Sequence, residues 1–270
     1  MFTKSSSGFN SIVGYSLVIL LSMFAIIGLQ LPQLNKIINR SKTASIEELK
    51  REVTAEKARL DLMQKIPSLG FSNLIADWTL LSFLQYFGDD VARDRTGFEL
   101  SPNYFEIIVD RDPHFLKSYL FLSTSVSLFG GEPEKAIALM AKGLKSITPE
   151  QPGAYYVWRY KGTDELLFLG DTKKAERSFA KAAEWASEFS DPESQNIATI
   201  SRKTAEFLAD DPDITTAQEG AWAMVLVNSL NTGDERTRKR IIERIEAQGG
   251  KVIISPEGAV SVKLPKSNSN

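Results

Sequence analysis

A lone histidine and a few carboxylate pairs are the side chains of this sequence most suited to chemistry. The chain has no cysteine, which excludes disulfides, thiolate zinc sites and a cysteine nucleophile. His114 follows Asp112-Pro113 at the start of a predicted helix, where a partly exposed structural histidine is common. The pairs Asp89-Asp90 and Asp210-Asp211 adjoin turns and lack the apolar setting that raises a carboxyl pKa. We therefore predict no catalytic residue, no metal, no cofactor and no enzymatic activity.

The densest mixture of aromatic and charged residues lies between positions 155 and 165. Aromatic residues and arginine are enriched at protein interfaces because they bury a large area at a low entropy cost. The predicted protein-binding residues are Tyr156, Trp158, Arg159 and Lys161. The alternative is core packing of one helix, with the two basic side chains paired to Asp164 or Glu165 at helical spacing.

A basic helix is predicted from residue 234 to residue 248. Its candidates for contact with anionic lipid headgroups are Arg236, Arg238, Lys239 and Arg240. Three acidic residues in the same helix favour the alternative of an ordinary solvated face.

Composition and charge exclude several classes of protein. The 270 residues are 43% hydrophobic and 24% charged, which is typical of a folded chain and excludes both a disordered polymer and a multi-span membrane protein. The net charge of −2 argues against a nucleic-acid partner, because such binders usually carry a basic excess.

The N-terminal region predicts a single transmembrane helix. No charge occurs between Lys4 and Lys36, and the apolar run from Ile12 to Leu31 is 20 residues long. Such a run can cross about 30 Å of hydrocarbon as a helix. Basic residues are more numerous after the run than before it, so the body is predicted on the cytoplasmic side. The sequence thus predicts a single-pass protein with the lipid bilayer as a partner.

The rest of the chain is predicted to be an all-α body with a small β-hairpin. The predicted parts are a tail (1–11), a transmembrane helix (12–31), a stalk helix (32–70), a helical repeat domain (71–248), a β-hairpin (249–264) and a disordered tail (265–270). Within the repeat domain, Leu74, Trp78, Leu81 and Gln85 fall on one face of a helix that is rich in aromatic residues.

Two segments of the body repeat one another. Gly131 to Leu144 aligns with Gly170 to Ala183 after a shift of 39 residues, and an apolar helix precedes each segment. Two successive helix–turn–helix units are therefore predicted. Ala175 and Ala180 are placed where the second unit's helices approach closely.

These segments resemble the tetratricopeptide repeat family. Gly170, Ala175, Phe179 and Ala182 fit the family's second-helix pattern, and Gly131, Ala136, Met140 and Gly143 fit it less well. The period is 39 residues rather than the family's 34, so the resemblance implies an irregular version over about residues 71–189. It also implies a concave protein-binding surface.

Two segments, ADWTLLSFLQYFGD and WRYKGTDELLFLGD, resemble sequences of membrane-anchored repeat proteins of photosynthetic bacteria. That similarity implies a thylakoid or bacterial inner membrane. It also implies a role in assembling or maintaining a membrane complex, for example a photosynthetic one, through contacts with its subunits. The sequence therefore predicts a membrane-anchored protein-binding scaffold. A periplasmic or luminal cell-envelope repeat protein is the alternative, and an enzyme is a more distant third.

Overall fold

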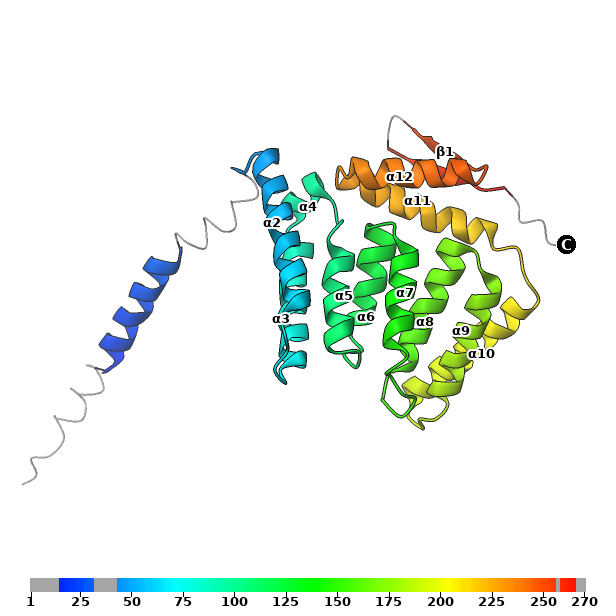
Figure 1. The fold of residues 1–270 in the computed structure, drawn as a ribbon, viewed down its shortest axis with the longest axis horizontal. Coiled ribbons are helices and arrows are strands. Elements are labelled where there is room, and N and C mark those ends of the chain that lie inside the picture. Colours follow the sequence, from blue (N-terminus) through cyan, green and yellow to red (C-terminus); the bar gives the residue numbers. More distant parts are fainter. Residues whose placement is uncertain (1–14, 32–42, 256–257, 266–270) are drawn as a thin grey trace, which may run out of the picture. The chain divides into compact units, whose positions relative to one another are not determined.

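The computed structural model describes residues 15–31, 43–255 and 258–265 (Figure 1). The chain divides into two compact parts, Met1–Ser45 and Ile46–Asn270. The larger part, Ile46–Asn270, is called the body below. In the smaller part, residues 15–31 form a helix whose side chains are all exposed.

The predicted membrane span is corrected by the structure. Across the residues that the structure describes, no helix combines the length and the apolar character needed to cross a membrane. Residues 12–14 of the predicted span lie outside the described residues. The prediction of a single-pass membrane protein, in the thylakoid or in a bacterial inner membrane, is therefore wrong.

Helices make up most of the body. Its first part contains α2 (Ile46–Lys65), α3 (Ser72–Phe87), α4 (Asp90–Thr96) and α5 (Ser101–Arg111). The predicted stalk helix corresponds to α2, which belongs to the body because Leu49 and Leu60 are buried and Tyr104 of α5 hydrogen-bonds to Glu56.

The repeated segments form two helix–turn–helix units. The first unit consists of α6 (Ser118–Leu122), the π-helical segment η1 (Ser123–Phe129) and α7 (Pro133–Gly143). The second unit consists of α8 (Tyr155–Asp164), the π-helical segment η2 (Glu165–Leu169) and α9 (Thr172–Ala186). Each turn contains a left-handed glycine, Gly131 with φ 61° and Gly170 with φ 67°, at equivalent positions. The units thus share a left-handed turn and a π-helical ending of the first helix.

The C-terminal part of the body contains α10 (Pro192–Ala209), α11 (Thr215–Asn231), α12 (Glu235–Ala247), β1 (Lys251–Ile254) and β2 (Val260–Lys263). The two strands are antiparallel, with Val252 opposite Val262. The predicted β-hairpin is therefore present. Helices α11 and α12 lie across one end of the upright helices (Figure 1). Their core includes Trp222, Ile241 and Val262, together with Phe168 of η2.

Aspartate caps explain where several helices begin. The carboxylates of Asp89, Asp171, Asp191 and Asp234 accept hydrogen bonds from backbone N–H groups in the first turns of α4, α9, α10 and α12. Such a cap satisfies a donor that has no partner within its helix, and replacing it by alanine typically costs about 1 kcal/mol.

Ala175 and Ala180 form a matched pair for testing the packing of α9. Ala175 is buried, whereas Ala180 is exposed, so the prediction of close approach is met at the first position and not at the second. We expect Ala175→Leu to lower the free energy of unfolding by about 1–3 kcal/mol, because added methyl groups strain a packed core. Ala180→Leu should change it by no more than about 0.5 kcal/mol. Urea unfolding of both variants measures the difference, and equal effects would contradict the packing of α9.

Candidate protein-interaction surface

One side of α3 presents large apolar side chains to solvent. Leu74, Trp78 and Leu81 are 64%, 60% and 56% exposed and follow one another at helical spacing. The opposite side is covered, with Ala76 and Phe83 fully buried. Because large apolar residues lie on both sides of α3, a single covered face leaves others in water, beside the exposed polar residues Asn73, Asp77 and Gln85.

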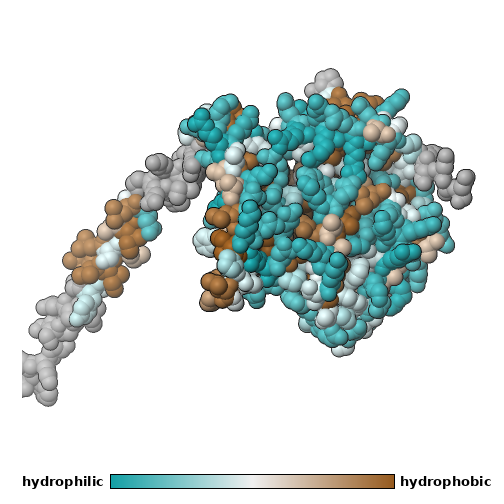
Figure 2. Space-filling view, viewed as in Figure 1, coloured by the Kyte–Doolittle hydropathy of each residue, from teal (hydrophilic) through white to brown (hydrophobic). Residues whose placement is uncertain are grey.

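This exposed surface continues beyond the three central residues. We define the apolar α3 face as Phe71, Leu74, Trp78, Leu81 and Leu84. Exposed apolar side chains also lie at the C-terminal end of α2, in the loop that follows it and on α6: Leu62, Ile66, Leu69, Leu120 and Phe121. Figure 2 shows brown, hydrophobic side chains gathered over the α2–α3 end of the body.

The apolar α3 face is large and nearly free of charge. A whole aromatic side chain offers about 150–250 Å², so Phe71 and Trp78 alone expose on the order of 250 Å². Contiguous apolar patches of about 300–600 Å² are the largest on a typical monomer, and they often mark functional sites. Asp77 is the one charged residue in α3. Little electrostatic cost therefore opposes covering this face with another apolar surface.

Aromatic packing fixes α3 to its neighbours. The buried Phe83 ring lies 4.7 Å from the ring of Phe105 and 5.7 Å from that of Tyr104, both on α5. It also lies 6.4 Å from the Phe121 ring of α6. Such edge contacts are specific in geometry, so they hold α3 in one orientation.

Arg111 fixes the end of α2 that precedes α3. Its Nη2 atom donates to the backbone oxygens of Met63, Gln64 and Ile66, at 3.2, 3.0 and 2.6 Å. These carbonyl groups lie at a helix C-terminus, where intrahelical donors are lacking. Because α5 supplies the arginine, the loop that leads into α3 begins from a fixed point.

The four predicted protein-binding residues make contacts within the body. Tyr156 donates to Glu193 at 2.7 Å, and Nη1 of Arg159 donates to Ser201 Oγ at 2.7 Å. Trp158 packs edge-on against Trp185 with 5.8 Å between ring centroids, and Lys161 pairs with Glu165. None of the four side chains is fully exposed. The structure thus places them where α8 meets α9 and α10, rather than on an open surface.

The four predicted membrane-surface residues form ion pairs. Arg236 pairs with Glu99, and Arg240 pairs with Glu132 at 3.2 Å. Within α12, Arg238 lies 3.4 Å from Glu235 and Lys239 lies 3.8 Å from Glu243. Two of these basic residues therefore connect α12 to other parts of the body, and all four lie beside a carboxylate.

Neither a metal site nor a histidine-centred site is formed by the described part of the chain. Within it, no group of three or more His, Asp or Glu side chains could hold a metal ion. His114 is exposed, and its Nδ1 atom lies 2.9 Å from Oε1 of Gln151.

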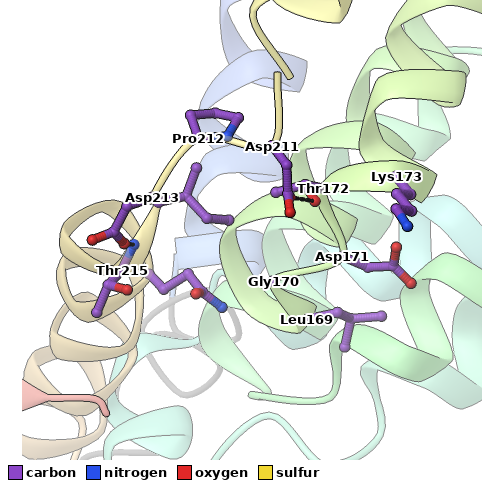
Figure 3. A pocket seen from close by; sticks show the side chains of 11 residues that line it. Leu169, Gly170, Asp171, Thr172, Lys173, Asp211, Pro212, Asp213 and Thr215 are labelled. Carbon is purple, nitrogen blue, oxygen red and sulfur yellow. Dashed lines mark hydrogen bonds between the residues drawn. The ribbon is translucent and has the colours of Figure 1, made fainter. Parts of the chain in front are cut away.

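A pocket of about 410 Å³ lies between the turn before α9 and the loop before α11 (Figure 3). Its aspartates already have structural roles. Asp171 caps α9 and pairs with Lys174 at 2.8 Å, and Asp211 accepts a hydrogen bond from Thr172 at 2.6 Å. Asp171 thus stabilises the first turn of α9, and Asp211 joins the loop before α11 to the start of α9.

Sequence analysis noted the apolar stripe of α3 but did not select it as a site. The informative signal is that a 16-residue helix with one charge follows a strongly charged helix, so that more apolar surface is present than one covered face requires.

Comparison with protein-family models, with curated proteins and with solved structures found no match to this chain.

Proposed function

We propose that the protein is a helical scaffold that binds another protein through the apolar α3 face. The observation that carries this proposal is the exposure of Leu74, Trp78 and Leu81 on a helix held rigidly by Phe83. Tryptophan is enriched among the residues that contribute most to binding, and it acts best when surrounded by apolar contacts that exclude water. Trp78 has such neighbours on its own helix.

The chemistry of the surface indicates the kind of partner. An exposed apolar helix with one acidic residue suits a partner helix that has an apolar stripe and few acidic groups. Two such helices pack with their axes about 8–10 Å apart. The resemblance to tetratricopeptide repeats, with a longer period, agrees with a binding role. The surface proposed here, however, lies on α3 and not on the aromatic–basic helix α8.

Site-specific photo-crosslinking in the native cell tests the proposal. A benzophenone amino acid at position 81 should give a discrete adduct with one protein. The same group at Lys203, an exposed polar position on α10, is the matched control and should give none. Absence of an adduct at position 81, or the same adducts from both positions, would contradict the proposal.

Affinity for the crosslinked protein gives a quantitative prediction. Trp78→Ala should weaken that complex about 30-fold or more, because truncating a central aromatic anchor costs about 2 kcal/mol. The variant should unfold at the same temperature as the parent, since Trp78 is largely exposed. Calorimetric titration measures the affinity, and an unchanged dissociation constant would exclude Trp78 as an anchor.

A further inference from the structure

The carboxyl group of Asp164 is buried between the two helix–turn–helix units. Asp164 ends α8 in the second unit and is 2% exposed. Its two oxygens accept hydrogen bonds from Ser123 at 2.9 Å and from Ser127 at 2.6 Å. Both serines belong to η1 of the first unit. One carboxyl group therefore joins the two units through two hydrogen bonds.

In the described residues, no cation compensates this carboxyl group. Among the described residues, no Lys or Arg side chain donates a hydrogen bond to Asp164 or forms an ion pair with it. The nearest basic residue in sequence, Lys161, pairs instead with the buried Glu165, which also accepts from Ser178 at 2.6 Å. Two adjacent carboxyl groups thus share a buried region that contains one ammonium group.

Within the part of the chain that the structure describes, no basic group of the surrounding helices pairs with Asp164. Helix α6 has no charged residue, and η1 has none either. The charged residue of α11, Glu219, pairs with Lys263. Basic groups on α7 and α9 pair with carboxylates elsewhere: Lys135 with Glu132, Lys142 with Asp110, Lys174 with Asp171, and Lys181 with Glu184. The acidic Glu134 of α7 pairs with Arg244, and the remaining charges of α9 are Lys173, Glu176 and Arg177.

We propose that Asp164 is a pH-sensitive contact between the two helix–turn–helix units. When it is protonated, the carboxyl group is neutral, and it can donate to one serine hydroxyl while accepting from the other. When it is ionised, the same position holds a buried negative charge whose partners among the described residues are two neutral hydroxyl groups. The contact should then weaken, because an unpaired buried charge is costly. This proposal rests on a different site from the apolar α3 face and does not depend on the proposed function.

The setting of Asp164 agrees with this direction. Burial is the main cause that raises the pKa of Asp164, the hydrogen bonds from Ser127 and Ser123 lower it, and the charge of the neighbouring Glu165 adds to the rise, so that the pKa is about 7. An aspartate in the unfolded chain titrates near 3.9. The folded state therefore holds the proton over a range in which the unfolded state has lost it, so this group lowers stability as the pH rises from about 4 to about 7.

The segments that meet at Asp164 are both π-helical. Ser123 and Ser127 lie within η1, and Asp164 immediately precedes η2. π-Helical turns are rare in proteins overall, and those that occur are often found at functional sites. A change at Asp164 would therefore act directly on η1 and on the start of η2.

Urea unfolding of the full chain at pH 6 and pH 8 tests the proposal. Between these values Asp164 alone should increase the unfolding constant about tenfold in the parent protein. Asp164→Asn, which keeps the shape and the acceptor oxygen, should abolish this increase. Asp171→Asn is the matched control and should retain it, because the Asp171 pKa is lowered, so that carboxyl titrates well below pH 6. Equal pH dependence in the parent and in Asp164→Asn would overturn the proposal.

Hydrogen exchange shows where in the body the pH-dependent loss of stability occurs. Amides of residues 123–130 and 165–170 should lose protection from pH 6 to pH 8, after correction for intrinsic rates, more than amides of α3 and α10. Loss spread evenly over the body would contradict a local contact.

Ser127→Ala is a second variant, for the case in which Asp164→Asn does not fold. It removes a hydrogen-bond donor that favours the ionised carboxylate, so the fall in stability with pH, the transition that Asp164 causes, should move to higher pH. An unmoved transition would also count against the proposal.

Discussion

Replacing Trp222 by alanine is expected to lower the free energy of unfolding by about 3–5 kcal/mol. Trp222 of α11 is 1% exposed, and its ring lies 5.3 Å from that of Phe168 in η2, edge to face. The guanidinium of Arg244 lies 4.8 Å from the ring centroid on the α12 side. Truncation would leave a cavity where the C-terminal helices meet the second helix–turn–helix unit.

Trp78→Ala is the matched control for this prediction. It removes the same side chain from the exposed face of α3, where no cavity can form. The change in unfolding free energy should therefore be within about 0.5 kcal/mol. Urea unfolding followed by far-ultraviolet circular dichroism measures both variants without relying on tryptophan fluorescence. Equal losses in the two variants would mean that Trp222 does not hold the C-terminal helices in place.

Local signals in the sequence predict much of the body. The equivalent glycines Gly131 and Gly170 mark the turns, because a left-handed backbone favours glycine. The β-branched runs around residues 251–263 predict the β-hairpin. These features depend on residues within a few positions of one another, which is the range over which periodicity and turn chemistry act.

The membrane prediction failed because hydropathy is also a local signal. A long apolar run at the N-terminus satisfies a window average, whereas crossing a bilayer requires that the helix itself be long enough. No helix among the described residues is both long enough and apolar enough to do so. The π-helical segments were also not predicted, because no side-chain period distinguishes them from an α-helix over one or two turns.

The two sites depend on contacts between distant parts of the chain. The sequence shows that large apolar residues lie on both sides of α3, but which side is covered depends on Phe105 and Phe121. Helical spacing suggests that Asp164 or Glu165 pairs with Arg159 or Lys161, and Lys161 does pair with Glu165. The burial of Asp164 arises from η1, which lies 37 to 41 residues earlier in the chain. Such a partner cannot be identified from spacing within one helix.

The aromatic–basic helix α8 gives the last prediction, which separates core packing from a binding face. We expect Trp158→Ala to lower the free energy of unfolding by about 2 kcal/mol, less than the about 3–5 kcal/mol of a fully buried tryptophan, because the ring is half-buried against Trp185. Arg159→Ala should cost about 1 kcal/mol through its lost hydrogen bond to Ser201 on α10. Arg202→Ala, at an exposed neighbouring position, is the control and should change stability little.

Binding measurements on the same variants complete this test. If α8 packs within the body, Trp158→Ala should lose stability and still crosslink to the partner through position 81 at temperatures where it remains folded. If the residue were instead a contact for the partner, the variant would keep its unfolding temperature and lose the complex. The contacts of Tyr156, Trp158, Arg159 and Lys161 with α9, α10 and η2 favour the first result. The protein would then present its binding surface at the α3 end of the body and use α8 to hold its helical units together.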